Sequence, residues 1–160
     1  MSRSVRESII LAAPPERVWQ LVMDPSLLER WVTTHDSLEG AGSGPVSPGD
    51  EFTQRLRLAG TRFKVRWRVI EADEPRFARW EGRGPAGSKA DVTYRFVAED
   101  GGTRFEYCNH FALPGGPLGK AAGGLLVAAP GAREARRSLE QLRSLVEREG
   151  ERARERAAST

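Results

Sequence analysis

The strongest constraint on the fold is a series of short segments, between residues 51 and 112, in which apolar and polar side chains alternate. In KVRWRVIEA, every second residue from Val65 to Val69 is apolar, and the residues between them are basic. The segments DVTYRFVA and TRFEYCNHFA alternate in the same way. A period of two is typical of strands with one buried face and one wet face. The pattern therefore predicts a sheet that is covered on one side.

Turn-forming residues separate these segments. The separators AGT, ADEP and EDGG are short enough for hairpins, so consecutive strands should pair antiparallel. A further strand, VRESIILA, precedes two prolines near the start of the chain. We expect strands at residues 5–12, 32–39, 51–58, 63–72, 76–82, 90–98 and 103–112.

Two short helices are expected between the first two strands. Pro14 and Pro15 can begin a helix because a proline has no N–H group to leave without a partner there. Asp24 precedes Pro25, which ends this helix and lets Asp24 cap a second one. The predicted helices span residues 15–23 and 25–31, and they contain Trp19 and Trp31. We expect both tryptophans in the core, with contact to a ligand as the alternative.

The C-terminal part of the chain changes to a helical period. Leu139, Leu142, Leu145 and Val146 recur at intervals of three and four, which predicts a long helix over residues 132–149. A shorter helix carrying Leu125 and Leu126 should end near residue 129, unless the two form one kinked helix. Residues 150–160 have no apolar stripe, and we expect this charged tail to fray.

Composition limits the class of protein. The 160 residues, 39% hydrophobic and 29% charged, suit one domain with a single core. We find neither a run of about 18 apolar residues nor an apolar stretch in the leading MSRSVRES, so we expect a cytoplasmic protein. The lone Cys108 cannot form an internal disulfide, and we expect it to be a small residue of the sheet rather than a nucleophile.

The order of these elements and three segments carry a family resemblance. APPERVWQLVMDPSLLERW, SPGDEF and RRSLEQLRSLVE resemble the START-like superfamily (SRPBCC), in particular its polyketide cyclase/dehydrase branch of small bacterial proteins. The resemblance implies an α+β helix-grip fold, in which a curved seven-stranded antiparallel sheet surrounds a long C-terminal helix. It covers residues 1–149 and implies an apolar cavity between the sheet and that helix.

Polar side chains on the inward faces of the strands are the candidate ligand contacts in such a cavity. Each has a structural alternative: a buried tyrosine can bond to the backbone, and Asn109 can mark the exposed end of its strand. The predicted ligand-binding residues are Asn109, Tyr107, Tyr94, Trp67, Gln54, Asp36, Thr34 and Phe111.

Catalytic and metal-binding patterns are not evident in the sequence. His35 and His110 are the two histidines, and the alternation that turns Phe111 inward turns His110 outward. No His-x-x-x-His or paired-cysteine spacing is present. We therefore assign no catalytic residue, metal or cofactor.

Three functions remain open from the sequence. The leading one is binding of a hydrophobic small molecule, such as a lipid, a polyketide or an aromatic metabolite. The alternative is a cyclase/dehydratase-type enzyme in which Asn109, Tyr107 or Asp36 stabilises an enolate or moves a proton.

The third function is electrostatic. Basic residues on the outer face of neighbouring strands could meet nucleic acid or an anionic membrane: Arg55, Arg57, Lys64, Arg66 and Arg68. We favour a solvated surface, because no aromatic residues are interleaved on that face to stack bases. The expected partner is a hydrophobic small molecule, without nucleic acid or stable membrane insertion, for a monomer or weak homodimer.

Overall fold

One antiparallel sheet of seven strands organises the computed structural model, which describes residues 2–58, 60–114 and 131–160. Its strand order is β1-β7-β6-β5-β4-β3-β2, so every strand from β2 to β7 pairs with its neighbour in sequence. The expected seven strands are confirmed, and their bounds are β1 Ser2–Leu11, β2 His35–Glu39, β3 Glu51–Leu58, β4 Thr61–Asp73, β5 Phe77–Arg83, β6 Lys89–Glu99 and β7 Gly102–Ala112.

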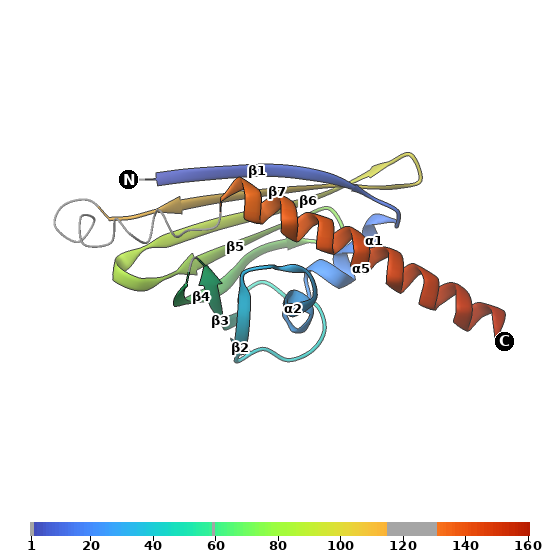
Figure 1. The fold of residues 1–160 in the computed structure, drawn as a ribbon, viewed down its shortest axis with the longest axis horizontal. Helices are drawn as coiled ribbons and strands as arrows, with labels where there is room; N and C mark the ends of the chain where they lie inside the picture. Colours follow the sequence, from blue (N-terminus) through green and yellow to red (C-terminus); the bar gives the residue numbers. More distant parts are fainter. Residues whose placement is uncertain (1, 59, 115–130) are drawn as a thin grey trace.

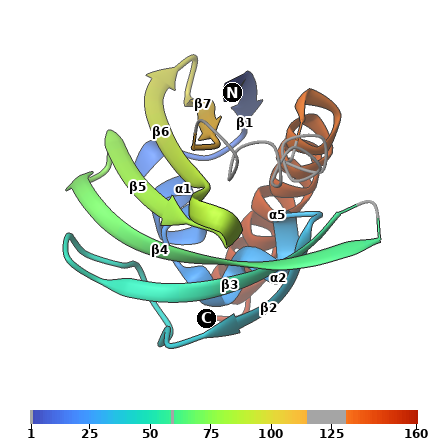
Figure 2. The ribbon, with the colours of Figure 1, turned by 90° about the vertical axis from the view of Figure 1, so that its left-hand side faces the viewer.

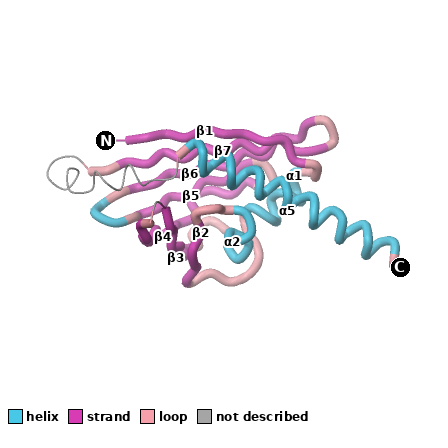
Figure 3. The backbone as a smooth tube through the Cα atoms, viewed as in Figure 1, coloured by secondary structure: helices cyan, strands magenta, loops and turns pink. Residues whose placement is uncertain are grey.

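The sheet curves around the long C-terminal helix α5, Ala132–Ala158. Figure 1 shows α5 lying across the sheet, and Figure 2 shows the strands bending around the interior with α5 on the open side. Figure 3 shows the same division, with the strands forming one layer and the helices lying against it. This arrangement is the helix-grip fold that the sequence predicts.

The two expected helices after β1 are present. The first is α1, Pro15–Val22, and it buries Val18, Trp19 and Val22. The second begins as a 3-10 turn η1, Pro25–Leu27, and continues as α2, Leu28–Trp31. The Asp24 carboxylate accepts hydrogen bonds from the Ser26 N–H and hydroxyl at 3.0 and 2.6 Å, which confirms the predicted cap. A second 3-10 turn, η2, Pro85–Gly87, precedes β6.

The core fills the space between the concave face of the sheet and α5. Trp19 packs against Phe96 of β6 with ring centroids 5.1 Å apart, and Leu142 of α5 is fully buried. Apolar residues of the alternating strands and of the C-terminal helix belong to a single buried cluster, which includes Val65, Trp67, Val69, Val92, Tyr94, Phe96, Phe105, Leu139, Leu142 and Val146.

Two boundaries differ from those expected. β2 begins at His35 rather than at residue 32, because the Val32 N–H still donates to the Leu28 carbonyl oxygen at 2.8 Å and closes α2. The expected end of α5 at residue 149 is wrong, because the helix continues to Ala158.

Glutamate and arginine favour helix, and an ion pair between Arg152 and Glu149 at 3.3 Å supports the extra turns of α5. Fraying of residues 150–160 stays a prediction. The shorter helix expected to end near residue 129 lies outside the described residues.

Candidate functional site

A cavity of about 90 Å³ lies between the concave face of the sheet and α5. Residues of α2, of the strands β3 to β7 and of the first two turns of α5 line it. Most of this lining is aliphatic or aromatic. Seven of the eight predicted ligand-binding residues are on it: Thr34, Gln54, Trp67, Tyr94, Tyr107, Asn109 and Phe111.

The eighth residue, Asp36, is not on the cavity lining, so its expected inward position is wrong. The register of β2 against β3 shifts between His35 and Ser37, which is a bulge in the edge strand. A bulge inserts a residue and breaks the alternation of the two faces. Asp36 is therefore exposed, and its carboxylate lies 4.0 Å from the Arg57 guanidinium.

Aromatic rings form the frame of the cavity. The centre of this frame is Trp80 of β5, which contacts the rings of Phe52, Trp67 and Tyr94 edge-on at centroid distances of 5.4, 6.1 and 5.3 Å. Tyr94 in turn stacks on Tyr107 of β7 at 6.1 Å. Edge-on and offset contacts are favoured geometries for aromatic pairs, so these rings hold one another in place.

A glycine makes room for one of these rings. Gly82 of β5 lies directly opposite Trp67 of β4. A Cβ atom at Gly82 would come within 2.8 Å of the Trp67 ring and 2.7 Å of Val65 Cγ1. Both distances are far below ordinary contact, so the position of the Trp67 ring depends on the missing side chain.

A chain of hydrogen bonds leads from the cavity to the edge of the sheet. The Trp67 indole N–H donates to Gln54 Oε1 at 2.9 Å, and Gln54 Nε2 then donates to His35 Nδ1 at 3.0 Å. His35 therefore accepts through Nδ1, and its neutral ring carries the proton on Nε2. Burial lowers the pKa of His35, although the carboxylates of Glu29 and Asp36 oppose this shift.

Tyr94, Tyr107 and Asn109 form a polar cluster on two neighbouring strands. Burial raises the pKa of Tyr107 to about 12, and the Asn109 side chain, as its hydrogen-bond partner, lowers it by less. Burial also raises the pKa of Tyr94, and the nearby Tyr107 adds to this effect. Both phenols are therefore neutral at physiological pH and can donate or accept hydrogen bonds.

Three polar atoms, each deeply buried and each belonging to a residue of the lining, have no hydrogen-bond partner within the described ranges. They are Nε1 of Trp31, Nε1 of Trp80 and Oδ1 of Asn109. Trp31 was expected in the core, and it is both a core residue and part of the lining. Trp19 is core and is not on the lining.

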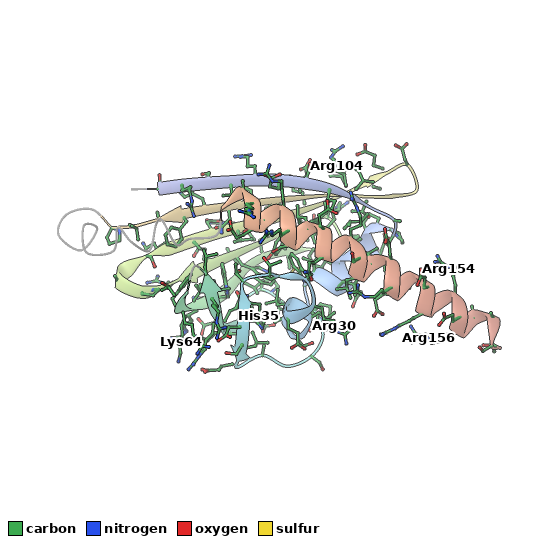
Figure 4. The ribbon with its side chains drawn as sticks, viewed as in Figure 1. Arg30, His35, Lys64, Arg104, Arg154 and Arg156 are labelled. Carbon is green, nitrogen blue, oxygen red and sulfur yellow. The ribbon has the colours of Figure 1, made fainter. Side chains whose placement is uncertain are left out.

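Most of the basic side chains on the outer face of the sheet lie close to carboxylates. Arg66 lies 3.0 Å from Glu51, and Arg55 and Lys64 lie 3.5 and 4.0 Å from Glu39. Figure 4 shows Lys64 among the charged side chains on the outside of the molecule. Exposed pairs of this kind are typical of a solvated surface.

Two structural patterns are absent from the described part of the chain, a metal-ligand cluster and a membrane-spanning helix. There, no group of three or more His, Cys, Asp or Glu side chains could hold a metal ion. Nor is any helix there long and apolar enough to cross a membrane. Cys108 is half-buried within β7, and His110 bonds to Ser4 Oγ at 2.8 Å on the exposed face.

Comparison with known proteins identifies the family to which this chain belongs. A family model described as polyketide cyclase / dehydrase and lipid transport matches residues 2–147. The chain belongs to this family. The predicted START-like relationship and the helix-grip fold are thereby confirmed.

The relatives and structural neighbours of this chain differ widely from it in sequence. The uncharacterized protein MT1597 of Mycobacterium tuberculosis is 29% identical over 123 residues, covering 74% of this chain and 85% of that protein.

Among solved structures, the ZhuI aromatase/cyclase of Streptomyces sp. R1128 has a TM-score of 0.74 at 16% identity, covering 92% of this chain and 95% of its own. TTHA0849 of Thermus thermophilus has a TM-score of 0.69 at 21% identity, covering 90% and 97% of the two chains. At these identities the two structures show a shared fold.

Two residues important for the site were missed from the sequence. Trp80 alternates with Ala78 and Gly82, and this alternation already indicated an inward position for it. Ser138 of α5 accepts a hydrogen bond from the Thr33 N–H at 3.1 Å and so ties the helix to the segment before β2. Nothing in the local sequence indicated that contact, because it joins residues far apart in the chain.

Proposed function

We propose that this protein binds a hydrophobic small molecule, such as a lipid, a polyketide or an aromatic metabolite, between the sheet and α5. The observation that carries the proposal is the largely apolar cavity with a few convergent polar groups, Tyr94, Tyr107 and Asn109 among them. Binding pockets for small molecules have this composition. The description of the family, which includes lipid transport, supports the same function.

The size of the cavity sets a condition on the ligand. A dry cavity of about 150 Å³ holds benzene, whereas the present volume is about 90 Å³. Even a ligand with a single ring therefore has to displace side chains. Val32, Phe63 and Phe111 are lining residues that are only half-buried, and their rotation would enlarge the cavity.

A titration with the neutral dye N-phenyl-1-naphthylamine tests the proposal on the full chain. Ala135 of α5 is buried on the lining, so Ala135→Phe should fill the cavity and weaken dye binding by about tenfold or more. Ala132→Phe adds the same ring at an exposed position of the same helix and should leave the affinity unchanged. Equal affinity of the parent and both variants would place the dye elsewhere and contradict the proposal. Native mass spectrometry of the purified protein would identify a co-purifying ligand.

The second candidate is an enzyme of the cyclase/dehydratase type acting on such a ligand. Two protonated phenols beside Asn109 can donate hydrogen bonds to a developing enolate oxygen, and the ZhuI aromatase/cyclase has a similar fold.

The lining offers this candidate no acid–base pair among the described residues. Its carboxylate, Glu134, accepts a hydrogen bond from the Gly131 N–H at 3.1 Å and caps α5. Tyr107→Phe distinguishes the two functions: an enzyme would lose turnover of a β-ketone chain and keep dye affinity, whereas a binding protein has no turnover to lose.

The proposal also covers the cellular location of the protein, its oligomeric state and its macromolecular partners. We infer a cytoplasmic protein of bacterial type that is a monomer or weak homodimer. We infer also that it does not bind nucleic acid, because exposed arginines on the outer face are matched by carboxylates. Light scattering coupled to size-exclusion chromatography measures the oligomeric state, and a mass above that of a dimer would contradict this part.

A further inference from the structure

The three unpartnered atoms on the cavity wall differ from the other polar groups around them. Trp31, Trp80 and Asn109 are only 3%, 2% and 9% exposed, so bulk water does not satisfy them. The Trp67 indole, by contrast, has Gln54 as an acceptor. Buried polar groups in folded proteins are nearly always hydrogen-bonded, to protein, water or ligand. Within the described residues, Trp31, Trp80 and Asn109 are three such exceptions on one cavity, whereas the unpartnered Ser88 Oγ belongs to a residue off its lining.

We propose that the ligand is a neutral, mainly apolar molecule with two kinds of oxygen: a carbonyl or ether that accepts from the indole N–H of Trp31 or Trp80, and a hydroxyl that donates to Asn109 Oδ1. These three side chains then select the ligand among hydrophobic molecules of equal size. This inference rests on the proposed binding function.

The packing around these side chains prevents them from finding partners by small rotations. Trp80 is held by aromatic contacts on several sides, and Trp31 meets Phe105 edge-on at 6.5 Å. Oδ1 of the Asn109 amide is buried without a hydrogen-bond partner among the described residues. The carbonyl oxygen of that amide therefore stays available.

The charge of the lining indicates a neutral ligand. None of the described lining residues is Arg, Lys or His, so a buried carboxylate would lack a counter-charge. The Glu134 carboxylate is on the lining and would repel an anion. A free fatty acid with its head group inside is thus disfavoured, whereas a hydroxylated ketone fits.

The test uses four single-ring probes that differ in one group at a time. They are 1,4-diethylbenzene, 4-ethylacetophenone, 4-(hydroxymethyl)acetophenone and 4-ethylbenzoate. The first pair compares an ethyl group with a ketone, the second compares an ethyl group with a hydroxymethyl group, and the last probe carries a negative charge. Affinities are measured on the full-length parent and on single variants.

The affinity ratio of the hydroxymethyl ketone to the ethyl ketone is measured in each protein. This ratio should be about fivefold higher in the parent than in Asn109→Leu. Trp31→Phe or Trp80→Phe should remove a gain of similar size for the ketone over diethylbenzene. Trp19→Phe is the matched control, since Trp19 is buried but lies off the lining, and it should change neither ratio. The benzoate should bind at least about tenfold more weakly than the ethyl ketone.

A measurement on the unmodified protein covers the case in which a variant fails to fold. The chain has four tryptophans, and each gives one indole N–H signal in a ¹⁵N-correlated spectrum. The ketone probes should move the Trp31 or Trp80 signal and leave that of Trp19, which lies off the lining, nearly in place.

The outcomes separate the inference from the function on which it rests. If the probes bind with the same ratios in every variant, the cavity is a general apolar site, its polar atoms are satisfied by water, and the inference is overturned while binding stands. Tight binding of the benzoate overturns the neutral ligand. If neither these probes nor N-phenyl-1-naphthylamine binds, both proposals fail.

Discussion

Replacing Gly82 by alanine tests how the sheet makes room for the aromatic frame. The new methyl group would lie 2.8 and 2.9 Å from two carbons of the Trp67 ring and 2.7 Å from Val65 Cγ1. Ordinary contacts between carbon atoms are about 3.5–4.0 Å, so the neighbours must move by nearly 1 Å. The ring is rigid and its N–H is bonded to Gln54, so it cannot move without loss. Overpacking of this kind costs about 1–3 kcal/mol of folding free energy.

Urea denaturation followed by circular dichroism measures that cost. Gly42→Ala is the control, because a Cβ atom at Gly42 has no neighbour within 4 Å, and we expect a change of less than about 0.5 kcal/mol. Gly82→Ala should also weaken dye binding, since the displaced Trp67 ring has the cavity on its free side. If Gly82→Ala cost no more than Gly42→Ala, the close approach of the ring to the strand would be refuted.

Four further predictions follow from other parts of the fold. Leu142→Ala should lower the free energy of unfolding by about 2–5 kcal/mol, since the side chain is fully buried in the grip, and a loss below about 0.5 kcal/mol would show that α5 does not close the core. Because partial burial lowers the pKa of His35 in the folded protein, the unfolded chain binds this proton first, and stability should fall as the pH drops below about 6.5. His35→Gln should flatten that part of the stability curve, and equal slopes for parent and variant would contradict the half-buried ring.

The two tyrosines of the chain are Tyr94 and Tyr107, and burial raises the pKa of both, so the phenolate absorbance of the folded protein should stay flat through pH 10. At higher pH the unfolded chain loses these protons first, so the absorbance should rise only as the protein unfolds. An ordinary titration near pH 10 would place the two phenols in water. A triple variant of the outer face changes Arg55, Arg66 and Arg68 to glutamine. Surface ion pairs contribute little to folding stability, so this variant should keep its dye affinity. Tight, salt-sensitive binding of DNA by the parent alone would instead reveal a nucleic-acid site.

The sequence was sufficient for the parts of the fold that depend on local pattern. Alternation located β4, β6 and β7, and it correctly turned Tyr94 and Asn109 inward. The same rule failed at Asp36, where a bulge shifts the register of β2. A bulge leaves little trace in five residues of mixed polarity, so period-two reasoning could not detect it. The same alternation points Trp80 of β5 inward, and the structure places it on the cavity lining.

Contacts between distant segments were beyond sequence reasoning. The bond from Thr33 to Ser138 and the chain from Trp67 through Gln54 to His35 depend on how strands and helix meet in space. The unpartnered atoms are a property of packing as well, since a tryptophan in the sequence does not reveal where its N–H points. The lack of partners for these buried polar atoms therefore emerged only from the structure, whereas most of the lining residues were predictable from the sequence.

The position of β1 beside β7 also governs the order in which the molecule can fold. Strands β2 to β7 form successive hairpins, each of which can close as soon as it leaves the ribosome. β1 is synthesised first but pairs with the last strand, with Ser2 opposite Ala112 and Leu11 opposite Thr103. Such a separation slows folding, because a long loop must close before the contacts form. The N-terminal strand thus waits, with its apolar Ile9 and Leu11 uncovered, until nearly the whole chain has been translated, and this interval is when the nascent protein is most exposed to aggregation or to capture by a chaperone.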